Sequence, residues 1–203
     1  MKETFRIFVE GVADKVFIEQ YFSHIFEQLV PDGCIVMTDG KDNNRQAVAN
    51  QMREISANDG INLVIFDADQ NIDARRDELL AWKKKEELDF ELFLVPNDND
   101  AGALEELLEN IINPNNCPIM ECWENYEKEL VKLDIPKRTP PPLTTPAKKT
   151  KIYGYLEALL GTSKEQKALI KERNREYYND LHWNLNAEYL EPLKEFLRKH
   201  LGD

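Results

Sequence analysis

The sequence predicts an α/β fold in which a mainly parallel, four-stranded sheet is flanked by helices and followed by a helical C-terminal extension. Two observations support this class. From residue 5 to about residue 112, short apolar runs typical of buried strands alternate with stretches in which apolar residues recur every three or four positions. The connections between these units are short, which is typical of parallel strands joined by right-handed crossovers. After residue 116 only helical patterns remain.

The first half of the alternating region contains two strand–helix units. Residues 5–9 form an apolar run, and a helix is expected from residue 12 to residue 29 because its apolar residues keep helical spacing. Residues 34–37 are the second predicted strand. A polar stretch then leads to a second helix, whose expected inward-facing residues are Ala47, Val48, Met52 and Ile55.

The second half repeats the pattern. Residues 62–66 are predicted as a buried strand, and residues 71–87 as a heavily charged, mostly exposed helix anchored by Leu79, Leu80 and Trp82. Residues 90–95 are the fourth predicted strand. Asp100, in the polar loop that follows, is expected to cap the next helix, over residues 103–112.

The C-terminal part is predicted to be helical at residues 117–133, at 148–160 and in a last helix that ends near residue 201. The proline-rich stretch 136–146 cannot form a helix or a central strand. Because this part has few apolar residues for a core of its own, we expect it to pack on the sheet. The predicted division is therefore an α/β domain at residues 1–115 and a helical extension at residues 116–203.

Composition limits the possible functions. Asp and Glu number 38 against 26 Lys and Arg, a formal charge of -12, so the surface as a whole repels a nucleic-acid backbone. Phosphate binding would have to be local and assisted by a metal ion. The three cysteines have no C-x-x-C spacing, which favours free thiols in a reducing compartment. With no secretory signal and no apolar run long enough to span a membrane, we expect a soluble, cytoplasmic protein.

Acidic residues follow the strands at the positions where ligands bind in parallel sheets. Asp67 and Asp69 follow the third strand, Glu10 follows the first, and Asp14 lies one helical turn beyond Glu10. If the chain stays extended, Asp67 and Asp69 point the same way, and the carboxyl ends of parallel strands share one edge. Carboxylates this close repel each other unless a cation or a proton lies between them. The alternative is that Asp67 caps a turn and Asp69 caps the next helix.

Such a cluster contains only hard oxygen ligands, which favours Mg²⁺ or Mn²⁺ over zinc. The three histidines are not at ligand spacing from one another, and we interpret them as structural or surface residues: His24, His182 and His200. The sequence thus predicts a divalent-cation site at one edge of the sheet.

The motifs resemble a known domain. Phe8-Val9-Glu10-Gly11, followed after two strand–helix units by Phe66-Asp67-Ala68-Asp69, resembles the TOPRIM domain of topoisomerases, bacterial primases and OLD-family nucleases, a Rossmann-like fold. The spacing of Glu10 and Asp14 is more similar to the OLD type. Residues 94–108 and Gly40-Lys41 are similar to small stand-alone TOPRIM-like proteins of uncharacterised function. The resemblance covers about residues 5–112, with a weaker similarity at residues 149–153.

The resemblance implies a set of metal ligands. Glu10, Asp67 and Asp69 would hold one or two divalent cations, Mg²⁺ or Mn²⁺, and Asp14 and Glu105 could complete a second site. Two such ions would clamp the attacking and leaving oxygens of a phosphodiester. Among these ligands, Glu10 would also be catalytic.

A lysine near the ions would stabilise the negative charge of the transition state. Lys149 is the first candidate, from its position in the motif, and Lys41 is the second. The basic run of residues 148–151 is otherwise a solvated patch, although it is the best candidate for contacting phosphate in so acidic a protein.

The expected function is a divalent-metal-dependent nuclease of DNA or RNA, in phage defence or nucleic-acid repair, with water as the nucleophile. The chain has no G-x-x-x-x-G-K-[ST] loop, so an ATPase partner of the OLD kind would be a separate chain. The alternative is a non-catalytic TOPRIM-like subunit that binds metal or nucleic acid or has a regulatory role. A more distant alternative is a phosphatase of the haloacid-dehalogenase type, although that type carries its two aspartates on the first strand.

Overall fold

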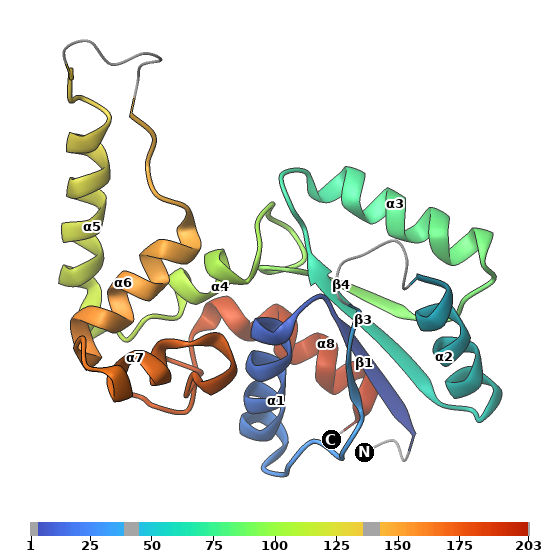
Figure 1. Cartoon of the computed structure of the whole chain (residues 1–203). Helices are drawn as coiled ribbons and strands as arrows, with labels where there is room; N and C mark the ends of the chain where they lie inside the picture. The colour runs from blue at the N-terminus through green and yellow to red at the C-terminus, as the bar shows by residue number, and fades with distance from the viewer. Residues whose placement is uncertain (1–3, 39–44, 136–142, 203) are drawn as a thin grey trace.

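The computed structural model describes residues 4–38, 45–135 and 143–202. Its centre is a four-stranded parallel sheet with the strand order β2-β1-β3-β4, which confirms the predicted α/β class (Figure 1). The strands are β1 (Phe5–Val9), β2 (Ile35–Met37), β3 (Ile61–Asp67) and β4 (Glu91–Val95). The two central strands, β1 and β3, are apolar almost throughout because helices cover both faces of the sheet.

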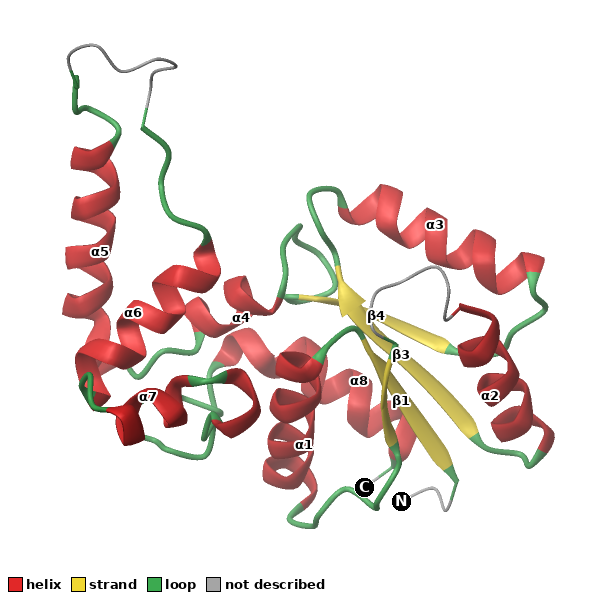
Figure 2. Ribbon diagram, viewed as in Figure 1, coloured by secondary structure: helices red, strands yellow, loops and turns green. Residues whose placement is uncertain are grey.

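Alternate residues of each strand enter two separate cores, as the pleat of a strand requires. One face packs against α1 (Val12–Phe26) and α8 (Glu191–Leu201), with Ile7, Leu63 and Phe93 pointing to it. The other face packs against α2 (Arg45–Ala57) and α3 (Ile72–Lys85). Figure 2 shows the resulting three layers of helix, sheet and helix.

The remaining helices follow β4. They are α4 (Leu104–Asn110), η2 (Pro114–Asn116), α5 (Cys117–Leu130), α6 (Lys148–Leu160), α7 (Lys164–Ile170), η3 (Glu172–Asn174) and η4 (Glu188–Leu190). Residues of this part, Tyr155 and Trp183 among them, share one hydrophobic core with α1 and the sheet. Phe196 of α8 packs against Phe93 of β4, with 5.3 Å between the ring centres. The division into two domains at residues 115 and 116 stays a prediction.

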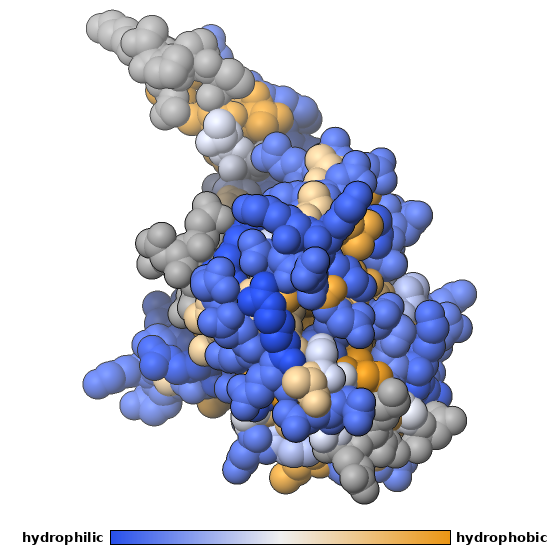
Figure 3. Space-filling model, turned by 90° about the vertical axis from the view of Figure 1, so that its right-hand side faces the viewer, coloured by the Kyte–Doolittle hydropathy of each residue, from blue (hydrophilic) through white to orange (hydrophobic). Residues whose placement is uncertain are grey.

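Helix α5 differs from the other long helices because none of its residues is buried, and it projects from the body of the molecule (Figure 1). Large apolar side chains are exposed just beyond its end, at Val131, Leu133 and Ile135. The face of the molecule that carries α2 and α3 is, by contrast, mainly hydrophilic (Figure 3). Among the described residues, no helix combines the length and apolar character that crossing a membrane would require.

Four details of the predicted elements are wrong. Ala47 is exposed and Ala49 is buried, because Ala49 lies three residues before Met52 and so shares its inward face of the helix. Leu80 is 44% exposed and anchors nothing. Helix α1 ends at Phe26 rather than at residue 29. Asp100 does not cap α4: the N-cap is Ala103, whose backbone N–H donates to the Glu106 carboxylate, while the side chain of Asp100 bonds within its own loop.

Candidate metal centre

The parallel topology brings the predicted acidic residues to one edge of the sheet. Strands β1 and β3 are neighbours, with Val9 beside Ile65, so Glu10, directly after β1, and Asp67, the last residue of β3, lie at the same edge of the sheet. Asp14 lies in the first turn of α1, directly beyond this edge. Glu105 lies in the first turn of α4, which follows the neighbouring strand β4.

The electrostatics of Asp67 show that these acids lie close together. The pKa of the Asp67 carboxyl is raised from 3.8 to about 8, first by burial and then by the negative charges of Asp14, Glu10, Glu105 and Asp69, in that order of strength. All five predicted metal ligands therefore belong to one cluster, which we call the acidic rim. The largest influences on the Asp67 carboxyl all favour its protonated form, and no ion pair with a basic side chain is present among the described residues.

Asp14 is the second perturbed member of the acidic rim. Burial raises its pKa to about 6, and the charges of Glu10 and Glu105 act in the same direction. A hydrogen bond from the backbone N–H of Gly11 to its Oδ2, at 2.9 Å, opposes the effect and fixes the carboxyl at the start of α1. Asp14 is thus both an acid in the first turn of α1 and a member of the acidic rim.

The backbone around Asp67 and Asp69 corrects one expectation. Strand β3 ends at Asp67, and Asp69 has a left-handed conformation with φ of 54°, so the two side chains do not continue one extended face. The Asp69 carbonyl accepts a hydrogen bond from Gly102 N at 2.7 Å, which ties the loop after β3 to the loop before α4. Strained conformations of this kind are frequent at functional sites.

The alternative roles of Asp67 and Asp69 as turn and helix caps have different outcomes. Asn71, not Asp69, caps α3, because its Oδ1 accepts a hydrogen bond from Ala74 N at 3.0 Å. Asp67 Oδ1 does accept a bond from the backbone N–H of Leu104 at 3.1 Å, which links the end of β3 to the first turn of α4. This bond orients Asp67 without neutralising it.

Sequence reasoning missed Arg75. Its Nη2 donates to Glu10 Oε1 at 2.7 Å, its Nη1 donates to Glu78 Oε2 at 2.8 Å, and its Nε lies 3.5 Å from Asp69 Oδ2. The side chain is only 17% exposed and stacks over the ring of Phe66. Its position in the sequence could have indicated this role, because Arg75 lies one turn beyond the cap of α3, and α3 starts at the carboxyl edge of the sheet.

The donor set fits a hard divalent cation, but the side chains are not yet arranged around one. In the part of the chain that the structure describes, no three Asp, Glu, His or Cys side chains are positioned to hold an ion. Arg75 supplies the positive charge beside Glu10 and Asp69 instead. Asp67 and Asp14, in contrast, have no cationic partner among the described residues. Ion binding would therefore require Glu10 and Asp69 to turn away from Arg75.

Of the two candidate lysines, only Lys149 lies among the described residues; Lys41 lies outside them. Lys149 is exposed on α6, pairs with Glu172, and is close enough to Glu105 for that charge to raise its pKa, although the bond to Glu172 is the larger cause. Its neighbours on α6 hold this helix against α4 through the pairs Lys148–Glu106 and Lys151–Glu109.

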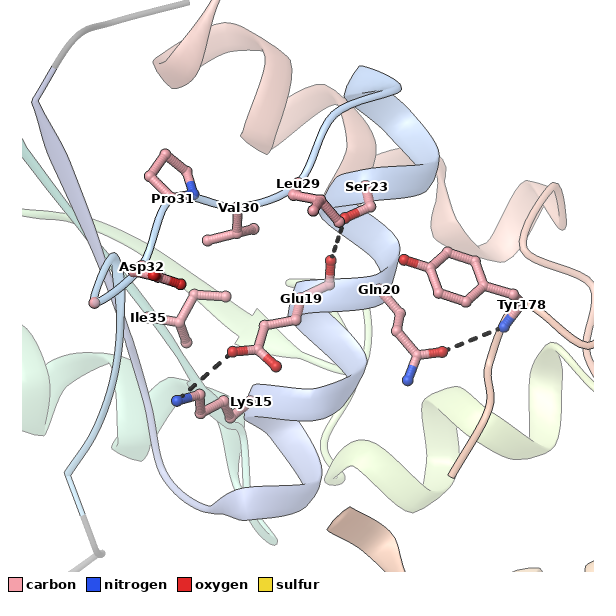
Figure 4. A pocket seen from close by; sticks show the side chains of 11 residues that line it. Lys15, Glu19, Gln20, Ser23, Leu29, Val30, Pro31, Asp32, Ile35 and Tyr178 are labelled. Carbon is pink, nitrogen blue, oxygen red and sulfur yellow. Dashed lines mark hydrogen bonds and ion pairs between the residues drawn. The ribbon is translucent and has the colours of Figure 1, made fainter. Parts of the chain in front are cut away.

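A separate hollow of about 310 Å³ runs along α1 beside the edge strand β2 (Figure 4). Two of its charged groups, Lys15 and Glu19, form an ion pair at 3.6 Å. Gln20 accepts hydrogen bonds from the backbone N–H groups of Tyr177 and Tyr178. It contains no member of the acidic rim, so the rim is the better candidate for chemistry.

Residues 4–202, almost the whole chain, match the family model described as "Protein of unknown function (DUF3226)". No curated protein and no solved structure matches the chain. The resemblance to TOPRIM domains and OLD-family nucleases therefore stays a prediction.

Proposed function

The chain belongs to the DUF3226 family of proteins of unknown function, and from its acidic rim we propose that it is a divalent-metal-dependent nuclease of the OLD/TOPRIM type. The reaction is hydrolysis of a phosphodiester bond in DNA or RNA. The observation that carries this proposal is the placement of Glu10 and Asp67 at the carboxyl ends of the neighbouring parallel strands β1 and β3, with the charges of Asp14, Asp69 and Glu105 acting on Asp67. Ligands of open α/β sheets bind at this edge.

The ligands in this proposal are Glu10, Asp67 and Asp69, with Asp14 and Glu105 for a second ion. Bound there, Mg²⁺ or Mn²⁺ would supply Lewis-acid stabilisation of the charge that develops on the phosphodiester oxygens. The chain itself fixes the ligands. The bond from Leu104 N orients Asp67, and the bond from Gly11 N orients Asp14.

Two basic residues have separate roles in this proposal. Lys149 pairs with Glu172 near Glu105, and it would have to leave this pair to neutralise charge on a phosphate bound at the rim. Arg75 keeps Glu10 and Asp69 in place while no cation is bound.

A second candidate function is favoured by Arg75. If its contacts with Glu10 and Asp69 are permanent, Arg75 takes the place of a cation at that side of the rim. The protein is then a non-catalytic subunit that binds metal or nucleic acid, or regulates a partner. The absence of a preformed three-ligand group among the described residues favours this alternative.

The test is cleavage of plasmid DNA, single-stranded DNA and RNA in Mg²⁺ or Mn²⁺ by the wild type, Asp67→Asn and Asp77→Asn. Asp77 is a matched control because it is an exposed aspartate on α3 outside the rim. We expect cleavage by the wild type and Asp77→Asn, and none by Asp67→Asn. Metal binding without cleavage of any substrate would favour the second candidate. If no substrate is cleaved and calorimetry shows binding of neither Mg²⁺ nor nucleic acid, the nuclease and the binding subunit are both refuted.

The cellular setting follows from the same proposal. We place the nuclease in the cytoplasm, in phage defence or nucleic-acid repair, and the three free cysteines Cys34, Cys117 and Cys122 support a reducing compartment. An ATPase, if one takes part, acts as a separate partner chain. Copurification of an ATPase with the tagged protein from its own cells would test this point.

A further inference from the structure

A second hollow adjoins the acidic rim. It has a volume of about 460 Å³ and is lined by Val12, Tyr153, Lys171, Glu172 and Arg173. Val12 is the first residue of α1 and follows Glu10 by two positions, so the hollow lies next to the Glu10 side of the acidic rim. The start of α1, helix α6 and the segment after α7 come together here (Figure 1).

The charge of this hollow is opposite to that of the rim. Lys171 and Arg173 are exposed, and neither has an ion-pair partner among the described residues. The carboxylate of Glu172, between them in the chain, is neutralised by Lys149. In a protein with a net charge of -12, two free cations beside a cluster of acids form a local site for anions.

The hollow also has an aromatic wall. The guanidinium of Arg175 lies over the ring of Tyr153, 5.4 Å from its centre. Arg175 is only 4% exposed, and it bonds the Ile170 carbonyl and the Tyr177 hydroxyl, so it is a fixed support for the ring. Aromatic side chains beside a positively charged groove are the platforms on which the bases of single-stranded nucleic acids stack.

We propose that this hollow binds single-stranded nucleic acid, with phosphates on Lys171 and Arg173 and a base against Tyr153. The inference rests on the proposed function, and it assigns the substrate as a single strand that passes from the hollow to the acidic rim. The volume lies within the roughly 300–1,000 Å³ of pockets that take a small ligand, which suits one or two nucleotides of a single strand. A duplex has a higher charge density, so the acidic surface of the protein disfavours it more strongly.

The test is binding of fluorescein-labelled oligonucleotides, measured by anisotropy in EDTA. Single-stranded DNA, single-stranded RNA and duplex DNA are compared for the wild type, Lys171→Ala/Arg173→Ala and Lys84→Ala/Lys199→Ala. The last variant is the matched control, because it removes two exposed lysines from the final turns of α3 and α8. Circular dichroism melting checks that each variant is folded.

We expect the wild type and the control to bind a single strand, and Lys171→Ala/Arg173→Ala to bind it at least tenfold more weakly. Loss of two phosphate contacts would also reduce the slope of log affinity against log salt by about 1.4 between roughly 50 and 200 mM salt. Tyr153→Leu is expected to weaken binding roughly fivefold or more through loss of stacking, and Tyr153→Phe to retain it. The DNA and RNA arms show which polymer is preferred.

Equal affinity of the Lys171→Ala/Arg173→Ala variant and the wild type would overturn the inference. So would duplex DNA binding as tightly as the single strand, or a wild type that binds no single strand. Because EDTA removes divalent ions, this outcome is independent of cleavage. Single-strand binding that depends on Lys171 and Arg173, without cleavage in Mg²⁺, would uphold the hollow and refute the nuclease.

Discussion

Replacing Asp67 by Asn tests whether burial of Asp67 among the other carboxyl groups of the acidic rim destabilises the folded protein. The substitution removes the charge but keeps the Oδ1 that accepts the bond from Leu104 N. Burial and the neighbouring carboxylates raise the pKa of Asp67 to about 8 in the folded protein, against an ordinary value of 3.8. We therefore expect Asp67→Asn to stabilise the protein in the absence of divalent ions.

The sign and size follow from proton linkage. Between pH 4 and pH 8 the unfolded chain has Asp67 ionised while the folded chain keeps it protonated, so wild-type stability falls as pH rises through this range. At pH 7 the cost of this protonation is at most about 4 kcal/mol. Partial solvation of the carboxyl reduces it, so we expect Asn to add about 1–3 kcal/mol. For a chain of this length, that is a rise in Tm of roughly 3–10 °C.

The assay is thermal unfolding in EDTA at several pH values from 5 to 8.5. The difference in Tm between Asp67→Asn and the wild type should grow as pH rises toward 8 and then level off. Asp77→Asn should show no such trend, because Asp77 is exposed and outside the rim. A destabilising Asp67→Asn, or a stabilisation that does not vary with pH, would refute the reasoning. Adding Mg²⁺ should raise the Tm of the wild type more than that of Asp67→Asn.

Three further substitutions test other parts of the site and the fold. Arg75→Gln frees Glu10 and Asp69, so it should lower the free energy of unfolding by about 1–3 kcal/mol without ions. It should also tighten Mg²⁺ binding in calorimetry. Weaker Mg²⁺ binding would contradict the competition between Arg75 and the cation for Glu10 and Asp69. Lys149→Met should reduce the cleavage rate tenfold or more, which corresponds to an increase of about 1.4 kcal/mol in the activation free energy. The affinity for Mg²⁺ should stay unchanged. An unchanged cleavage rate would show that Lys149 takes no part in the mechanism. Gly154→Val should lower the Tm, because a Cβ at Gly154 would lie 2.4 Å from the ring of Trp123 and push α5 away from α6; an unchanged Tm would show that α5 adapts freely.

The convergence of Glu10, Asp14 and Asp67 could be predicted because it depends on topology alone. Once β1 and β3 are recognised as parallel strands, their carboxyl ends must meet at one edge, whatever the details of side-chain packing. The bounds of β1 and α6 agree with the sequence pattern for a similar reason, since each is delimited by local signals. At these positions the secondary structure that the local sequence favours is the one that the fold requires.

Arg75 could not be predicted, because its role depends on the orientation of a helix. The few apolar residues of α3 fix its rotation through Leu79 and Trp82, which turns Arg75 over Phe66 toward Glu10. Sequence alone shows only a charged helix surface. The left-handed conformation of Asp69 is a similar case, since it follows from the backbone bond to Gly102, far along the chain.

The balance between Arg75 and a divalent cation decides which of the two candidate functions applies. Asp67 and Asp14 are half-buried and have no cationic partner among the described residues, so this part of the rim would gain from an ion even while Arg75 remains. Glu10 and Asp69 already have partial compensation from Arg75, so an ion must exceed that interaction to recruit them. If Asp67 and Asp14 alone held a cation, the proposed ligand set would be incomplete, which would favour binding without catalysis. If Glu10 also turned from Arg75 toward the cation, the proposed ligand set would be complete, and the freed guanidinium of Arg75 would be well suited to contact a phosphate.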